Sequence, residues 1–239
     1  MAVCGVLAAL MPGGVWGQAK VASAQAQAAA SPEPAWETEL HRRHDELVKR
    51  NGPGTDVALR ERLLGMRDRD QEARGLAHGQ PKGAGKLEMA TNMAEIDAAL
   101  TRELKSIVTE KGWPTIALVG IEASNGAMLM LTHSPDHEWQ RSLLTQLEGL
   151  ADTGKIDGSS LALVIDKELV SEGKLQRYGT QFKMLDGEMA MIGVEDPAGL
   201  DARRAKVFLS PMEAYKQRLA SMYHLKVSPK IVSPGNPGK

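Results

Sequence analysis

The chain of 239 residues contains a single cysteine, Cys4, close to its first residue. Cys4 lies too near the start to be read as a lipid-attachment cysteine, and removal of an N-terminal leader would leave a mature protein with no thiol. Disulfide bonds, thiol catalysis and cysteine-ligated metal sites are then excluded for the mature chain.

The chain also lacks an excess of charge of either sign, because 29 Lys and Arg residues face 30 Asp and Glu residues. A protein without a large net charge has no overall electrostatic attraction to nucleic acid or to an anionic membrane surface. We therefore expect no nucleic-acid partner, and any function that depends on charge must be local.

Three sequence motifs of nucleotide and hydrolase chemistry are missing. The chain has no glycine-rich phosphate loop, no Gly-x-Ser-x-Gly elbow and no dinucleotide fingerprint. Kinase, α/β-hydrolase and Rossmann folds therefore have no support. We predict that the protein has no cofactor.

A zinc site is also not expected, although His133 and His137 lie four residues apart. Ser134 and Pro135 between them indicate that His133 lies outside the helix that carries His137. No Glu follows His133, so the His-Glu-x-x-His metalloprotease arrangement is absent. The sequence thus predicts no metal ligands.

The first 26 residues resemble a secretory signal peptide. The apolar stretch Val6–Leu10 is too short to span a bilayer, and Ala22–Ala24 and Ala24–Ala26 fit small-x-small cleavage sites. The expected basic n-region is missing, so either the true start lies further upstream or the segment is an Ala/Gln-rich disordered leader. We expect export, with a periplasmic or secreted mature protein that has no membrane span.

The rest of the chain is dominated by helical patterns, in which apolar residues recur every three or four positions. Breaks rich in glycine and proline separate them. The sequence predicts a mainly α protein: a leader and surface helix over residues 27–54, one compact multi-helix domain over 55–225, and a disordered tail over 226–239. The expected helices cover residues 36–50, 55–73, 92–111, 134–150, 159–173, 197–209 and 211–225. The β-branched residues of 159–173 also allow a strand there, but a helix is preferred.

Hydroxyl side chains at the start of several of these helices predict their N-caps. They are Thr55, Ser134 followed by Pro135 at the first helical position, and Ser159 or Ser160. Ser210 with Glu213 predicts a capping box for the last helix.

Two other segments carry strand signals. Residues 176–185 and 188–194 flank Asp186-Gly187, which fits a two-residue turn, so we predict one small β-hairpin in the C-terminal third. Residues 115–132 are consistent with a buried helix or with two strands joined by Asn125-Gly126, and periodicity does not decide between them.

Asp70 is an acid on a helix face where an apolar residue is expected, because Leu59, Leu63 and Met66 precede it at helical spacing. An ion pair with Arg74, four residues later, would explain its presence there. The alternative is a polar site lined by Asp70, Gln71 and Arg74.

Several separated motifs occur together in a fixed order, and the series is more specific than any one of them. They resemble domain-of-unknown-function family 6624, a bacterial family without an established activity, over roughly residues 59–222. The resemblance favours a helix at 115–132, where Asn125-Gly126 departs from the family pattern. The motifs are Asp70-Gln71-x-x-Arg74, Gly112-Trp113-Pro114, Val119-Gly120, Ala123-Ser124, His133-x-x-Asp136 with Gln140, Glu172-Gly173-Lys174, and Tyr178-Gly179-Thr180-Gln181.

His133 is the strongest candidate for chemistry. It precedes the expected helix cap Ser134, and a helix N-terminus would favour a neutral imidazole and attract anions. His133 would then serve as a general base or line an anion site, unless it only hydrogen-bonds the neighbouring backbone. On the expected hairpin, the side chains of Tyr178 and Gln181 offer hydrogen bonds to a sugar or peptide, or else lock the helices together.

We therefore expect an exported hydrolase or transferase that acts on a small polar or cell-envelope substrate. The predicted catalytic residues are His133 and Asp136, and the predicted substrate-binding residues are Asp70, Gln71, Arg74, Gln140, Tyr178 and Gln181. The alternative is a non-catalytic binding or scaffold protein in which the same residues form a buried structural network.

Overall fold

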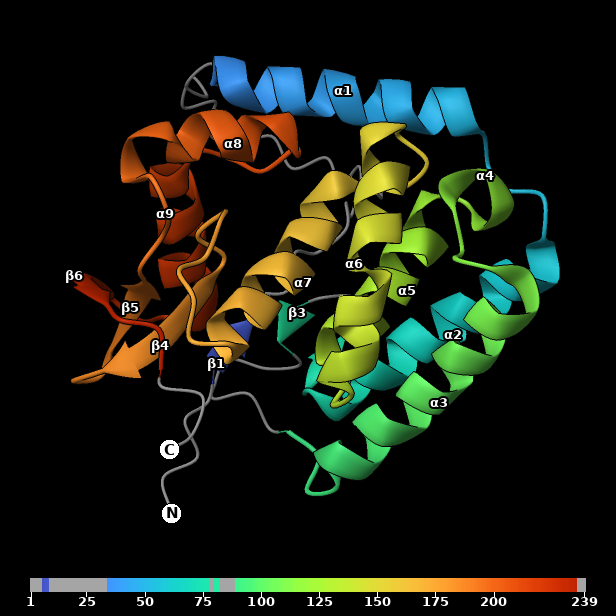
Figure 1. Ribbon diagram of the computed structural model, residues 1–239, viewed down its shortest axis with the longest axis horizontal. Helices are drawn as coiled ribbons and strands as arrows, with labels where there is room; N and C mark the ends of the chain where they lie inside the picture. Colours follow the sequence, from blue (N-terminus) through green and yellow to red (C-terminus); the bar gives the residue numbers. More distant parts are fainter. Residues whose placement is uncertain (1–5, 9–33, 78–79, 82–88, 236–239) are drawn as a thin grey trace, which may run out of the picture.

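The computed structural model describes residues 6–8, 34–77, 80–81 and 89–235. The predicted fold class is confirmed, because helices dominate and a small sheet lies near the C-terminal third (Figure 1). The predicted signal peptide falls almost entirely outside the described residues. No helix in the described part of the chain is long and apolar enough to cross a membrane.

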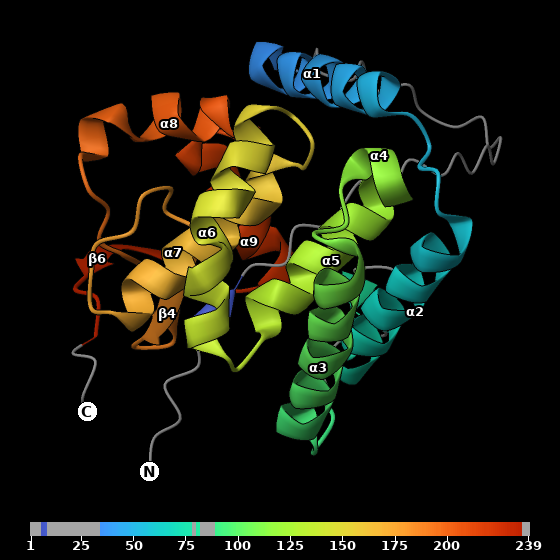
Figure 2. The ribbon, with the colours of Figure 1, turned by 45° about the vertical axis from the view of Figure 1, so that its right-hand side comes forward.

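Helix α5 (Ile121–His133) lies at the centre of the larger half of the molecule. It packs against α2 (Val57–Ala73), α3 (Met93–Lys111), the short helix α4 (Ile116–Val119) and α7 (Gly158–Ser171). Helix α6 (His137–Asp152) covers α7, and apolar side chains from all six helices form one core. Figure 2 shows α2, α3 and α5 on one side of α6 and α7, and the sheet on the other.

The uncertain segment at residues 115–132 is therefore helical, as the family resemblance favours. Because α5 is surrounded by other helices, its apolar residues occur on most of its circumference and periodicity could not identify it. A Cβ at Gly126 would lie 3.5 Å from the Leu63 carbonyl oxygen, an ordinary van der Waals contact with α2. Asn125 donates to Asp157 at 3.2 Å. The Asn-Gly pair thus lies within a packed helix and not in a hairpin turn.

A second core lies between the sheet and the C-terminal helices α8 (Leu200–Lys206) and α9 (Met212–Tyr223). The predicted hairpin is confirmed as β4 (Gln181–Leu185) and β5 (Glu188–Ile192), joined by a turn in which Asp186 and Gly187 both have positive φ. Phe182 of β4 meets Tyr215 of α9 edge to face, with ring centroids 6.0 Å apart.

The predicted disordered tail is wrong for residues 227–232, which form strand β6 (Val227–Val232). This strand pairs in parallel with β5 at the edge of a sheet of order β1-β4-β5-β6, where β1 is Val6–Ala8. The pairing skips Pro229 and Lys230, so the missing N–H of the proline breaks no ladder bond. Residues 236–239 of the predicted tail lie outside the described residues.

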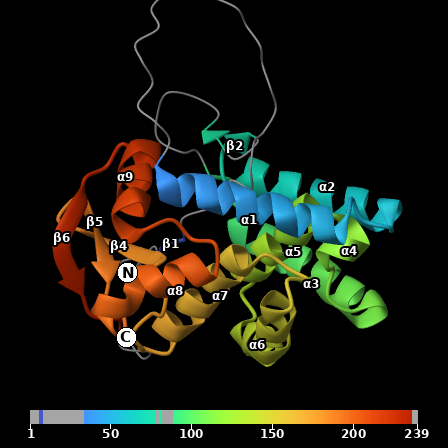
Figure 3. The ribbon, with the colours of Figure 1, turned by 90° about the horizontal axis from the view of Figure 1, so that it is seen from above.

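Helix α1 (Ala35–Asn51), the predicted surface helix, joins the two halves. Figure 3 shows it running from α8 and α9 at one end to α4 at the other. Arg43 donates to the Ala205 carbonyl oxygen at 2.5 Å, and Arg50 donates to that of Gly154 at 3.0 Å. The remaining regular elements are the two-residue strands β2 (Leu76–Ala77) and β3 (Gln80–Pro81) and the 3-10 turn Pro197–Gly199.

The predicted helix caps are corrected in several places. Asp56, Asp136 and Asp157 cap α2, α6 and α7, and each carboxylate accepts a backbone N–H of the first turn. A carboxylate also complements the positive end of the helix dipole, which the hydroxyls of Thr55, Ser134 and Ser159 or Ser160 do not. The N-cap of α9 is Pro211, so the Ser210–Glu213 capping box does not form.

Candidate functional site

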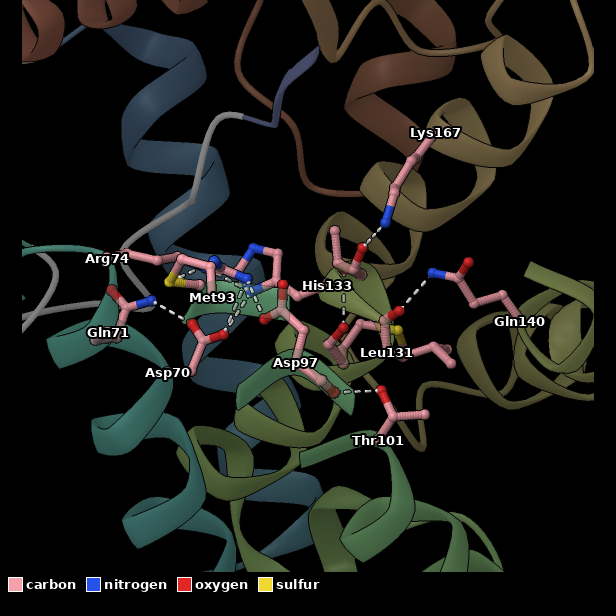
Figure 4. A network of polar contacts seen from close by, with 12 residues as sticks. Asp70, Gln71, Arg74, Met93, Asp97, Thr101, Leu131, His133, Gln140 and Lys167 are labelled. Carbon is pink, nitrogen blue, oxygen red and sulfur yellow. Dashed lines mark hydrogen bonds and ion pairs between the residues drawn. The ribbon is translucent and has the colours of Figure 1, made fainter. Parts of the chain in front are cut away.

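Four ionisable side chains meet at the C-terminal end of α5, in a group called here the His133 cluster: Asp70 of α2, Arg74 at the C-cap of α2, Asp97 of α3 and His133 of α5 (Figure 4). The His133 Nδ1 atom lies 2.7 Å from Asp70 Oδ1 and 3.0 Å from Arg74 Nε. A terminal nitrogen of Arg74 lies 2.7 Å from Asp97 Oδ1 and 3.3 Å from Asp70 Oδ1.

Asp70 is completely buried and has a hydrogen-bond partner on each oxygen. Its Oδ2 atom accepts from the Gln71 amide at 3.0 Å, while Oδ1 faces His133 and Arg74. The ion pair between Asp70 and Arg74 thus forms within the larger His133 cluster, so the ion pair and the polar cluster are not exclusive alternatives.

Asp97 of α3, which is not among the residues predicted from the sequence, completes the cluster. Residues 93 and 97 are one helical turn apart on α3, and the guanidinium of Arg74 spans both, with Met93 Sδ at 3.8 Å. Burial raises the pKa of the Asp97 carboxyl, and the charge of Arg74 opposes that rise. In the sequence, Asp97 is an acid beside the apolar stripe of this helix. Acids that face solvent show the same pattern, so the sequence does not distinguish Asp97 from them.

The position of His133 differs from the expectation. It is the last residue of α5 and not a neighbour of the α6 N-terminus, since α6 begins at His137 and is capped by Asp136. The C-terminus is the negative end of the helix dipole, so it favours a cation over a neutral imidazole. Burial is the larger effect, and it lowers the pKa of His133 despite the neighbouring Asp70.

The contacts of His133 determine which ring nitrogen carries the proton. Nδ1 cannot donate to Asp70 and accept from Arg74 at once, and the shorter contact to a carboxylate assigns the proton to Nδ1. The structure shows no hydrogen bond to the Nε2 atom within the described residues, and 10% of the side chain is exposed.

Lys167 of α7 also approaches this end of α5, which the sequence did not reveal. Its Nζ atom donates to the carbonyl oxygen of Thr132, the residue before His133 (Figure 4). Burial lowers the pKa of this amine, and the negative charges of Glu168 and Asp97 oppose that decrease.

Asp70, Asp97 and His133 offer three ligand atoms within 4.8 Å of one another, a set that could hold a metal ion. Two ligands of one zinc ion lie roughly 3.0–3.4 Å apart, given bonds of about 2.1 Å. The 2.7 Å between Asp70 and His133 is a hydrogen bond, and Arg74 already supplies the positive charge between the two carboxylates. The arrangement fits a guanidinium-centred cluster better than a metal centre.

The predicted site residues Asp136, the N-cap of α6, and Gln140 of α6 form no hydrogen bond or ion pair with the His133 cluster within the described residues. Asp136 accepts from the Trp139 backbone N–H at 3.0 Å and pairs with Lys105, whose hydrogen bond holds the pKa of Asp136 low. Gln140 is buried and donates to the Leu131 carbonyl oxygen at 2.5 Å. Both side chains fix the turn that follows His133.

Tyr178 and Gln181 belong to a different network, and in the described part of the chain neither hydrogen-bonds to His133. The backbone N–H groups of Tyr178 and Thr180 donate to the buried carboxylate of Asp166, at 2.9 Å in each case. The backbone N–H of Gln181 donates to the Gln176 side chain at 2.8 Å. The motif at 178–181 thus attaches the start of the sheet to α7.

His137 forms a second histidine–carboxylate pair, separate from the first. Its Nδ1 atom lies 2.7 Å from the buried Glu168, which also accepts from Arg141 at 3.1 Å. His137 and Arg141 line a shallow depression of about 560 Å³ together with Ser171 and Glu172.

The fold and the site define a mainly helical protein with a buried His–Asp–Arg cluster at the end of its central helix. A family of unknown function (DUF6624) matches residues 57–228, and the chain belongs to this family. The resemblance found in the separated motifs is thereby confirmed. No curated protein and no solved structure matches the chain.

Proposed function

We propose that the protein is an exported enzyme, a hydrolase or transferase that acts on a small polar or cell-envelope substrate, with the Nε2 atom of His133 as general base and acid. The observation that carries this proposal is the 2.7 Å contact between His133 Nδ1 and the completely buried Asp70. A histidine held in this way presents a fixed tautomer and a free acceptor, as general acid–base catalysis requires.

Each neighbour has a role in this proposal. Asp70 holds the proton on Nδ1 and stabilises the imidazolium that forms when Nε2 takes a proton from the attacking group. Burial lowers the pKa of His133, so the imidazole is neutral and ready to accept at neutral pH. Gln71 and Arg74 hold Asp70 in place, and Asp136 and Gln140 act as positioning residues through the turn after His133.

The competing function is a non-catalytic scaffold. It is favoured by the fact that both oxygens of Asp70 and one terminal nitrogen of Arg74 already have partners within the chain. Under this alternative the cluster fixes the packing of α2, α3 and α5, and removing His133 would cost stability without changing any activity.

His133→Asn separates the two functions. The Asn amide can replace Nδ1 as a donor to Asp70 but cannot act as a base. Wild type and variant would be assayed on chromogenic esters, amides, glycosides and phosphodiesters, and we expect activity on one class to fall by about 10²–10⁴-fold in the variant. His224→Asn is the matched control, because His224 has a left-handed backbone that Asn tolerates.

Full activity in His133→Asn would contradict the proposal. If the wild type turns over no class of substrate and His133→Asn melts at a lower temperature than the wild type, the scaffold function is favoured. A loss of activity equal to that of the His224→Asn control would show that the effect is not specific to His133.

A further inference from the structure

The outermost strands of the hairpin sheet differ in how well they could receive another strand. Strand β6 pairs with β5 through an irregular register, and the two residues that the pairing skips, Pro229 and Lys230, are exposed. A proline, a lysine and a bulge are features by which edge strands discourage pairing with another chain. The outer side of β6 is therefore poorly suited to strand addition.

The side of β4 that faces away from β5, called here the β4 edge, has none of these features. β4 pairs with β5 in an unbroken register from Phe182 to Leu185 and contains no proline. Its one charged residue, Lys183, donates to the carbonyl oxygen of Ser233, which follows β6. This side chain thus reaches across the sheet, away from the β4 edge, and does not guard it.

The hairpin register shows which backbone groups of β4 face its edge. Leu185 and Glu188 flank the two-residue turn, a position that forms a hydrogen-bonded pair, and such pairs recur at every second residue of an antiparallel ladder. Lys183 and Leu185 therefore direct their N–H and C=O groups to β5. Phe182 and Met184 direct theirs to the β4 edge.

In the structure a segment of the chain's own leader lies on this edge. Strand β1 pairs antiparallel with β4, with Leu7 opposite Phe182, and lies on the side of β4 away from β5 (Figure 1). Residues 6–8 belong to the apolar stretch of the predicted signal peptide, so export would remove them with the leader. The backbone groups of Phe182 would then lose the strand opposite them, which favours pairing with another extended chain.

We infer that the mature protein binds an extended, apolar peptide segment of a partner protein, which adds antiparallel to β4 in the place of β1. The N–H and C=O groups of Phe182 and Met184 would pair with the peptide backbone, as in other cases of strand addition. The apolar character of the partner follows from the Val-Leu-Ala segment that the edge accepts. The inference rests on the export in the proposed function, because removal of the leader opens the edge.

Opening the edge within the full chain tests this binding independently of export. Leu7→Pro removes the backbone N–H that residue 7 offers to β4, and Leu7→Ala is the matched control that keeps it. The probe is a synthetic peptide that carries residues 5–10 between terminal lysines, and amide hydrogen exchange is followed residue by residue. The Phe182 amide should exchange about tenfold faster or more in Leu7→Pro than in wild type or Leu7→Ala, and regain protection when peptide is added.

A second substitution locates the peptide. Met184→Pro, added to Leu7→Pro, removes an outward N–H group and spares the bonds to β5, so peptide affinity should fall by about tenfold or more while the hairpin remains. Unchanged Phe182 exchange in Leu7→Pro, or no protection by the peptide, would overturn the inference. Dimerisation of Leu7→Pro without peptide would overturn the choice of partner in favour of a second copy of the chain.

The chain recovered from the periplasm of an expressing bacterium keeps this inference distinct from the proposed export. A processed chain without residues 1–26 should bind the peptide as Leu7→Pro does. Peptide binding by Leu7→Pro, together with a recovered chain that keeps its leader, would refute export alone. A processed chain that does not bind the peptide would refute the peptide site alone.

Discussion

Replacement of Arg74 by Met tests the central claim that a guanidinium holds the His133 cluster together. The variant keeps most of the side-chain volume and leaves Asp70 and Asp97 without their shared cation. Breaking a buried ion pair from one side costs about 3–5 kcal/mol. Because Asp97 is 20% exposed and Asp70 keeps Gln71 and His133 as donors, we expect about 2–4 kcal/mol at pH 7.5.

Urea and thermal unfolding would measure this loss, and the midpoint should fall by about 5–15 °C for a domain of this size. Arg69→Met is the matched control, because Arg69 also joins α2 to α3 through a 2.7 Å pair, with Glu103. Its side chain is 56% exposed, so its loss should cost less than about 1 kcal/mol.

The loss should shrink as the pH falls from 7.5 to 5. Burial raises the pKa of Asp97 and Arg74 opposes that rise, so the pKa rises further in the variant. The folded variant then holds a proton that the unfolded chain has released, and its stability increases on acidification. Arg74 also lowers the pKa of His133, and its removal favours protonation of the folded state in the same pH range.

Two outcomes would refute this reasoning. Equal losses for Arg74→Met and Arg69→Met would show that the cluster contributes no more than a surface pair. A loss that does not change with pH would show that Asp97 and His133 are not coupled to Arg74. Arg74→Met combined with Asp97→Asn should recover part of the stability at pH 7.5, because the unpaired charge is gone.

Two further predictions concern the supporting structure. Asp166→Asn should lower the free energy of unfolding by about 2–4 kcal/mol in urea titrations. The buried carboxylate of Asp166 accepts from three backbone N–H groups and the Thr180 hydroxyl, whereas an amide nitrogen accepts no hydrogen bond. An unchanged unfolding midpoint would contradict that network. Gly54→Ala should cost about 3 kcal/mol or more of stability in thermal unfolding, and Gly52→Ala about 1–2 kcal/mol. Both glycines have positive φ, but only a Cβ at residue 54 would clash, at 2.4 Å from Gly120 N. Equal losses for the two variants would contradict the role of that close approach.

Much of the fold was predictable from local pattern. Apolar side chains at helical spacing identified α2, α3, α6 and α7, and Asp186-Gly187 identified the hairpin, because these signals depend on neighbours in the sequence. Helix α5 had no polar face to reveal its period, and only the family resemblance indicated it. Strand β6 could not be predicted, because it depends on hydrogen bonds to β5, about 40 residues earlier in the chain.

The sequence by itself determined that Asp70 stands on an apolar helix face with Arg74 one turn later, and that His133 is a candidate for chemistry. Only the tertiary structure added Asp97 and Lys167 to the same place and separated Tyr178 and Gln181 from it. The physical reason is that an acid or a lysine beside an apolar stripe has the same sequence pattern whether it faces solvent or a neighbouring helix. Packing of α2, α3, α5 and α7 decides which of these side chains meet, and with them the charge around His133.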